Sequence, residues 1–270
     1  MSQKRGQLTL FIVLGVVLVI LFSTFFYVVN YTQESTIEPE VERFSDRNIK
    51  DVNLFVETCF DSKVKTGLDM LGKQGGYIEF PENFPFQETS GTYIPLHYDE
   101  GDDNLPSLED MQNSLAGYIN QGVFVCLNDF LFFKEKGIEF SAAVMTTEVI
   151  ISESAVNIQL NYPVTITDKG GNIFKLASFN KNTPIKLKKM HEFAELVILA
   201  VKDYDESFEF FPDFIPNIQN YISYLAPELY LDPLPVPTSS HLFLWQIKGT
   251  AGNEEFNFIF GTKTSREMPH

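Results

Sequence analysis

Basic side chains and cysteines are scarce in this chain of 270 residues. It has 20 Lys and Arg against 36 Asp and Glu, which gives a formal net charge of −16 at pH 7. This acidic balance argues against a nucleic-acid partner, because phosphate binding needs clustered Lys and Arg. Two cysteines are too few for the disulfide framework of a miniprotein or for a four-thiolate metal site.

Motifs that carry chemistry are equally sparse. The four histidines are dispersed, and the sequence has neither a G-x-S-x-G elbow nor a dinucleotide fingerprint. Residues 67–74 approach a phosphate loop, but Gln74 replaces the hydroxyl residue that would hold Mg²⁺. We therefore expect no catalytic residue, no cofactor and no metal. The many acids still allow chance carboxylate pairs, so an extracellular hydrolase is the third functional alternative.

The hydrophobic fraction of 44% is ordinary for a globular protein, but it is unevenly spread. Residues 8–29 are 22 consecutive positions without a charge. As a helix they would span about 33 Å, enough for a hydrocarbon core of about 30 Å. The end of this segment is bulky and lacks the small-x-small exit of a secretory signal. The sequence therefore predicts a retained N-terminal transmembrane helix, with the lipid bilayer as its partner.

Flanking charges predict the orientation of this helix. Lys4 and Arg5 precede it, whereas acids beginning with Glu34 follow it. The positive-inside rule keeps the N-terminus in the cytoplasm and places the C-terminal domain outside the cell. Without residues 1–29 the chain has 18 basic against 36 acidic residues, so the exported part is even more acidic.

The run Lys4-Arg5-Gly6-Gln7 leads directly into the apolar segment. It resembles the class III signal peptide of archaeal type IV pilin-like proteins. The resemblance implies that a signal peptidase of the prepilin type cuts after Gly6, that Gln7 becomes the new N-terminus, and that the N-terminal helices self-assemble into a filament. The chain departs from the bacterial pilin pattern at Phe11, where a Glu is usual. The run from 71 to 78 is similar to uncharacterised membrane-anchored archaeal proteins, which implies no activity.

A different interpretation of the same residues stays open. Lys4 and Arg5 are also what a simple single-pass anchor carries as its topology signal, and Gly6 would then be an incidental loop residue. The leading expectation is thus a pilin-like surface or filament component that is not an enzyme. The alternative is a membrane-anchored extracellular binding module.

The rest of the chain divides by its periodicity. After a leader (1–6), the apolar helix (7–29) and a connector (30–40), apolar spacing of three and four predicts a helical, loop-containing part over 41–137, with two long amphipathic helices. Alternating patterns then predict an α+β part over 138–270, with strands near 147–151, 155–162, 164–166, 172–176, 242–248 and 255–260 and a helix over 186–202. The overall expectation is an α+β fold with an antiparallel sheet.

Three further features are candidate sites. Cys59 and Cys126 lie on the apolar stripes of the two helices, so they pair as a disulfide or remain two buried thiols. The acidic loop 99–104 offers oxygen ligands for Ca²⁺ but lacks EF-hand spacing, so a solvated loop is the favoured interpretation, as it is for the acidic run 203–206. The aromatic tract 208–230 is either core or a partner surface.

Overall fold

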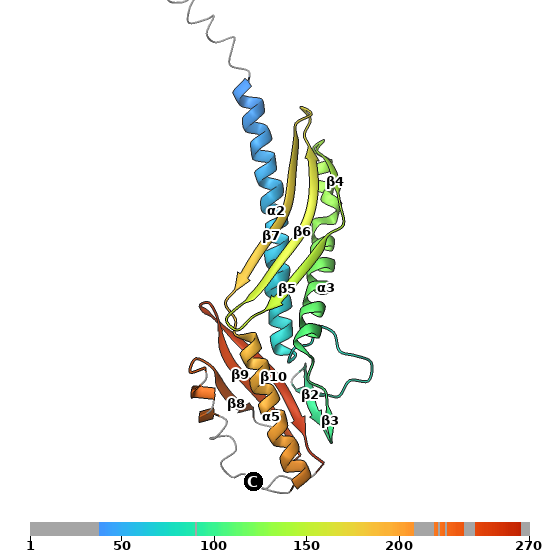
Figure 1. The fold of residues 1–270 in the computed structure, drawn as a ribbon. Helices are drawn as coiled ribbons and strands as arrows, with labels where there is room; N and C mark the ends of the chain where they lie inside the picture. Colours follow the sequence, from blue (N-terminus) through green and yellow to red (C-terminus); the bar gives the residue numbers. More distant parts are fainter. Residues whose placement is uncertain are drawn as a thin grey trace, which may run out of the picture.

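The computed structural model describes residues 38–89, 91–207, 219–220, 222–224, 226–234 and 241–265. The predicted leader, its processing point between Gly6 and Gln7, and the apolar segment lie outside the described residues. The described part is an elongated α+β structure with two sheets, one above the other in Figure 1. A pair of helices lies against the upper sheet and a third helix against the lower one.

Helix α2 (Glu38–Lys73) connects the two halves of the molecule (Figure 1). Its buried stripe includes Val52, Val56 and Leu71, a helical spacing that faces the core. The helix stops because Gly75 adopts a left-handed φ of +54°, and the N–H of Gly76 then donates to the Leu71 carbonyl at 2.6 Å. At Gly72 a Cβ would lie 2.5 Å from the Asn257 carbonyl, so glycine is needed where this helix passes the lower sheet.

Helix α3 (Leu108–Leu127) runs antiparallel beside α2 (Figure 1). It begins at Ser107, whose hydroxyl accepts from the backbone N–H of Asp110 at 3.1 Å and so caps the first turn. Its buried residues recur every fourth position: Met111, Leu115, Ile119, Val123 and Leu127. A single 3₁₀ turn, η1 (Asn128–Phe130), and the short helix α4 (Leu131–Lys134) follow.

The upper sheet has four antiparallel strands, β4 (Glu139–Ala142), β5 (Thr146–Ile151), β6 (Val156–Thr167) and β7 (Ile173–Thr183). Buried and exposed residues alternate strictly along the first half of β6. One face therefore packs on α2 and α3, and the other faces solvent (Figure 1). The register of β6 with β7 shifts between Asn161 and Val164, so the strand continues past Pro163 with an irregularity.

The lower sheet contains β1 (Phe86–Thr89), β2 (Thr92–Asp99), β3 (Asp102–Asp103), β8 (Tyr230–Leu234), β9 (Leu242–Ala251) and β10 (Glu254–Lys263). Helix α5 (Leu187–Ser207) packs against β2, β9 and β10. The strand order is β1-β2-β10-β9-β8, and β2 pairs with β10 in parallel. Tyr98, Phe258 and Phe260 are almost fully buried here.

The α+β class predicted from the sequence is confirmed, but two finer parts of the predicted architecture are wrong. The structure shows no N-terminal transmembrane helix; no helix in the described residues has the length and apolar character needed to cross a bilayer, and residues 7–29 are not among them. Where one antiparallel sheet was expected, the described chain forms two sheets with ten strands, and one pairing is parallel. Alternation identifies a strand but not its partner, and strand β2 contains Pro95, a residue that is unfavourable in a strand interior.

Candidate functional site

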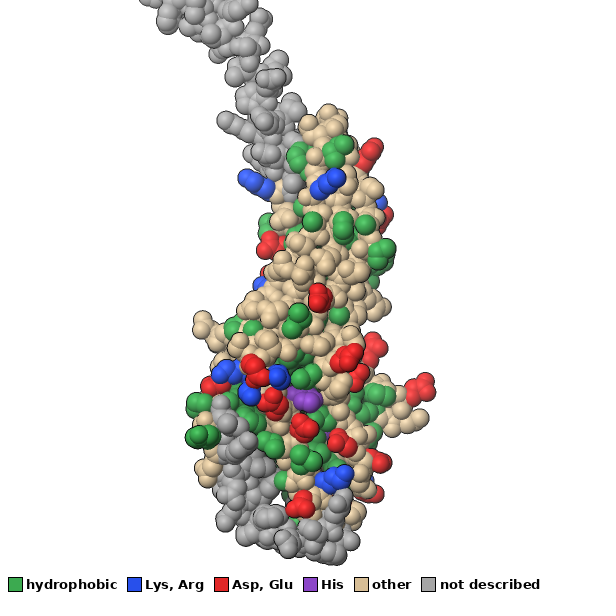
Figure 2. Space-filling model, viewed as in Figure 1, with side chains coloured by type: hydrophobic (Ala, Val, Ile, Leu, Met, Phe, Trp, Pro, Cys, Tyr) green, Lys and Arg blue, Asp and Glu red, His purple; other side chains and the backbone are tan. Residues whose placement is uncertain are grey.

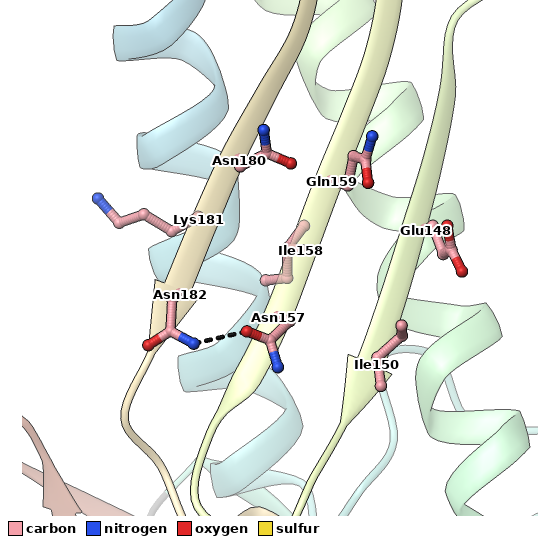
Figure 3. Close-up of a pocket in the computed structure, with 8 residues that line it drawn as sticks. All are labelled: Glu148, Ile150, Asn157, Ile158, Gln159, Asn180, Lys181 and Asn182. Atoms are coloured by element: carbon pink, nitrogen blue, oxygen red, sulfur yellow. Dashed lines mark hydrogen bonds between the residues drawn. The ribbon is translucent and has the colours of Figure 1, made fainter.

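A hollow of about 280 Å³ lies on the solvent face of the upper sheet. Its polar lining comes from the side chains of Glu148, Asn157, Gln159, Asn180 and Asn182, with Ile150 beside them (Figure 3). Lys181 and Ile158 also border the hollow, but their side chains point to the helix side of the sheet, where Lys181 pairs with Asp61 and Ile158 is buried. These residues belong to the three neighbouring strands β5, β6 and β7. The hollow therefore lies on a continuous sheet, whose pleat fixes the position of each side chain.

Strand register arranges these side chains in rows across the sheet. Glu148 pairs with Gln159, and Gln159 pairs with Asn180 on its other side. In the next row Asn157 lies between Ile150 and Asn182. Side chains in one row are about 5 Å apart, because that is the spacing of neighbouring strands. We call the four amides Asn157, Gln159, Asn180 and Asn182 the amide grid.

The amides of the grid are only partly satisfied by one another. The Asn182 side-chain N–H donates to the Asn157 Oδ1 at 2.5 Å, drawn in Figure 3, and the Gln159 side-chain N–H donates to the Asn161 Oδ1 at 3.1 Å. Among the described residues, the Asn180 carboxamide has no hydrogen-bonding partner. The grid therefore presents both donors and acceptors to solvent.

Charge is nearly absent from this surface. Lys181 forms an ion pair with Asp61 of α2 at 3.0 Å, so its positive charge is balanced. The lining contains one carboxylate, that of Glu148. Figure 2 shows the same contrast at a larger scale, since Asp, Glu, Lys and Arg gather over the lower half of the visible face and are sparse over the upper sheet. The amide grid is thus a nearly neutral surface on a strongly acidic chain.

The structure brings together the two cysteines that the sequence singled out. Cys59 of α2 and Cys126 of α3 form a disulfide, with 5.9 Å between their Cα atoms. Cys59 is buried, whereas Cys126 is half-buried at the edge of the helix pair. The bond closes a loop with a sequence separation of 67 and fastens the two helices that support the amide grid.

Two carboxylates of the acidic loop 99–104 lie next to a lysine of strand β10. Asp99 and Glu100 both lie near Lys263, at 3.5 and 2.6 Å from its Nζ. Within the described residues, no three His, Cys, Asp or Glu side chains are grouped in a way that could hold a metal ion. The solvated interpretation of the run 203–206 is wrong for Asp205, which is buried and accepts hydrogen bonds from the Tyr98 hydroxyl at 2.9 Å and the Ser265 hydroxyl at 2.6 Å.

The aromatic tract falls largely outside the described residues. Where it is described, Tyr224 and Tyr230 are exposed, so the core alternative does not hold for these two rings. Trp245 is buried, and its indole N–H donates to the Thr262 hydroxyl at 2.9 Å. The single tryptophan of the chain is therefore a core residue of the lower sheet.

A buried histidine occupies the core of the lower sheet. The His97 side chain is fully buried and stacks on Phe260 with ring centroids 5.2 Å apart. Neither of its ring nitrogens has a hydrogen-bonding partner within the described residues. Burial lowers the pKa of His97 to about 3, because the charged imidazolium would lose its hydration there. His97 is consequently a neutral core residue at physiological pH.

An exposed apolar cluster surrounds the turn between α3 and α4. Asn128, Asp129 and Phe130 all have positive φ, at 45°, 53° and 55°, a strained conformation for residues other than glycine. The turn leaves four apolar side chains exposed: Phe124, Val125, Leu131 and Phe132. Phe124 is exposed and its neighbour Val123 is buried, because the buried positions of the helix follow a spacing of four.

Sequence reasoning missed the amide grid. The alternation of Asn157, Gln159 and Asn161 with apolar residues predicts a strand, but it does not single out the polar face as a binding surface. The available signal was composition, since Asn is depleted in strands and recurs here at alternate positions. Asn180 and Asn182 lie in β7 beyond the predicted strand, so only the register of β6 with β7 places them in the grid.

Comparisons with known proteins identify no relative: no family model, no curated protein and no solved structure matches this chain. The resemblance to archaeal pilin-like proteins therefore stays a prediction from the N-terminal residues.

Proposed function

We propose that this protein is a non-catalytic component of the cell surface, pilin-like and built into a filament. The uncharged segment 8–29 would hold it at the membrane, with the N-terminus in the cytoplasm and the folded domain outside. The leader residues Lys4, Arg5, Gly6 and Gln7 carry this proposal. They provide the basic, glycine-ending leader next to an apolar segment that the processing of such proteins requires.

Two features of the folded domain support an extracellular location. The disulfide between Cys59 and Cys126 is of the kind that persists in oxidising compartments and is rare in the cytosol. The domain is also elongated, and α2, the first described element, starts at one extremity (Figure 1). A chain attached at that extremity would extend the rest of the domain away from the attachment point.

The test is the identity of the mature N-terminus. Mass spectrometry of surface-sheared and membrane fractions should find a chain that begins at Gln7. A Gly6→Val variant should retain Met1 and disappear from the sheared fraction, whereas the matched Gly15→Val change inside the apolar segment should still be processed. A wild-type chain that keeps Met1 in both fractions contradicts the filament proposal.

The second candidate function is a membrane-anchored extracellular binding module, and the amide grid favours it. The grid is open to solvent and rigidly placed, and most of its hydrogen-bonding groups are not used by the fold. Its lining holds one carboxylate, Glu148, whereas glycoside hydrolysis normally uses a pair. This hollow therefore suits binding better than the hydrolase alternative.

A further inference from the structure

We infer that the amide grid is a binding site for a neutral, polyhydroxylated chain, that is, a cell-surface or extracellular glycan without charged groups. The inference names the ligand class of the binding-module alternative and rests on that proposed function. It also holds if the protein is a filament subunit, because the upper sheet would then be displayed many times along the filament.

The composition of the exposed face is the first observation that carries this inference. Asn is depleted in strands, whereas Thr and other β-branched residues are favoured. Yet three Asn side chains are exposed in two adjacent strands, Asn157 in β6 and Asn180 and Asn182 in β7. Gln159 is also exposed in β6, directly opposite Asn180. Strand formation does not explain this choice of side chains. Local conflicts of this kind are expected where a surface has a binding role.

The chemistry of the grid selects the ligand. Each carboxamide offers two donor hydrogens and one acceptor oxygen, so a partner must supply both acceptors and donors at short spacing. The backbone groups of β6 are engaged with strands on both sides, so a ligand at the grid meets side chains and not an open strand edge. Sugar hydroxyls meet this requirement because each one both donates and accepts.

Charge excludes the competing anionic ligands. Lys181 points to the helix side of the sheet and is paired there with Asp61, and Glu148 forms no ion pair with a described residue. A phosphate, sulfate or uronate group would therefore meet an unpaired carboxylate and no free cation. A neutral ligand avoids this repulsion on a chain whose formal net charge is −16.

Apolar contact at the grid is limited, so the affinity of a single grid for a glycan should be low. Ile150 is 51% exposed beside Asn157 and offers one apolar surface to the C–H face of a sugar ring. The lining contains no aromatic ring. The hollow of about 280 Å³ has room for only a short stretch of glycan. Single-site binding is thus weak, and repeated display on a surface would strengthen it through effective concentration.

Titration of the full-length chain with neutral polysaccharides tests the inference. The chain is purified in a detergent without a sugar headgroup and titrated calorimetrically with mannan, dextran and soluble xyloglucan, with heparin as the anionic comparison. We expect saturable binding of at least one neutral polysaccharide and none of heparin. The double variant Gln159→Ala/Asn180→Ala should lower that affinity at least tenfold, because two exposed amides leave the grid while the fold is kept.

A matched control uses two other polar residues of the same strand. Thr165 and Thr167 lie on the non-buried side of β6, and Thr165 is about 20 Å along the strand from Gln159. The Thr165→Ala/Thr167→Ala variant should bind as the wild type does, and circular dichroism should show both double variants folded. Absence of binding to every neutral polysaccharide, or binding unchanged within twofold in the amide variant, overturns the inference.

The outcome is separable from that of the filament proposal. Glycan binding that depends on the grid, together with a retained Met1, supports this inference and the anchored binding module. A mature N-terminus at Gln7 without glycan binding supports the filament proposal and refutes the inference. Tight binding of heparin that is lost in the Gln159→Ala/Asn180→Ala variant also refutes it, because the ligand of the grid would then be anionic.

Discussion

Replacing the buried imidazole of His97 should change how the stability of the domain depends on pH. In the folded protein burial lowers the pKa of His97 to about 3, whereas in the unfolded chain it is near the ordinary value of 6.5. Between these two values the unfolded state binds a proton that the folded state does not. The stability that the neutral His97 contributes to the fold is therefore fully present above pH 6.5 and is lost as the pH falls toward 3.

The size of the effect follows from the difference between the two pKa values. Each pH unit in this window removes about 1.4 kcal/mol, so lowering the pH from 7 to 5 should remove about 2 kcal/mol of unfolding free energy through this group alone. A His97→Met variant lacks the titrating ring and keeps an apolar, flexible side chain in the same core position. Between pH 7 and pH 5 the unfolding free energy of this variant should therefore fall by about 2 kcal/mol less than that of the wild type.

Fluorescence of Trp245 provides the assay. It is the single tryptophan of the chain, it is 2% exposed, and it lies in the same sheet as His97. Urea unfolding is followed at pH 7, 6 and 5 for the wild type, for His97→Met and for a control variant, His241→Gln. Carboxylates titrate alike in all three chains, so the comparison isolates one histidine. If wild type and His97→Met lose the same stability between pH 7 and 5, the buried neutral histidine is refuted.

The remaining predictions concern individual contacts and are measured by urea unfolding of the full-length chain. Reduction of the bond between Cys59 and Cys126 should lower the unfolding free energy by about 4 kcal/mol in the chain-entropy model, and an unchanged midpoint would contradict this role. Asp205→Ala should lower it by about 3 kcal/mol, because the buried Tyr98 hydroxyl and the Ser265 hydroxyl lose their acceptor, while Asp205→Asn should be milder. Gly76→Ala should lower it by about 2 kcal/mol or more, since its φ is +100° and a Cβ would lie 2.8 Å from a proline ring; a neutral effect would show that the turn relaxes. Phe124→Ser should stay within about 0.5 kcal/mol, because this ring is 66% exposed, and a large loss would mean that it is covered.

Local patterns in the sequence predicted much of the secondary structure. The turn signal of Asp168 to Gly171 lies where β6 and β7 are joined, and the Asp168 carboxylate accepts from the backbone N–H groups of Gly170 and Asn172 at 2.8 and 2.9 Å. Ser107 caps α3 as its spacing to Asp110 predicted. These features depend on interactions within a few residues, so the sequence alone carries the information.

These local patterns do not predict which strands pair when the strands lie far apart in the sequence. Strand β2 contains Pro95, which is unfavourable in a strand, but it pairs with β10 across more than 150 residues. Its central residues are buried in the structure, so packing rather than local propensity makes it a strand. The burial of His97 in that strand and the removal of Asp205 from solvent have the same origin, since both depend on the core that β2 completes.

What the sequence determined by itself was the acidic balance, the uncharged segment 8–29, the leader residues that carry the proposed processing, and the places where helices and hairpins begin and turn. Which surfaces the folded chain presents depends on how its helices and strands pack. The disulfide was one of two open alternatives until α2 and α3 were placed side by side. The amide grid needed the register of three strands, because a one-residue slip would turn every one of its side chains to the other face of the sheet.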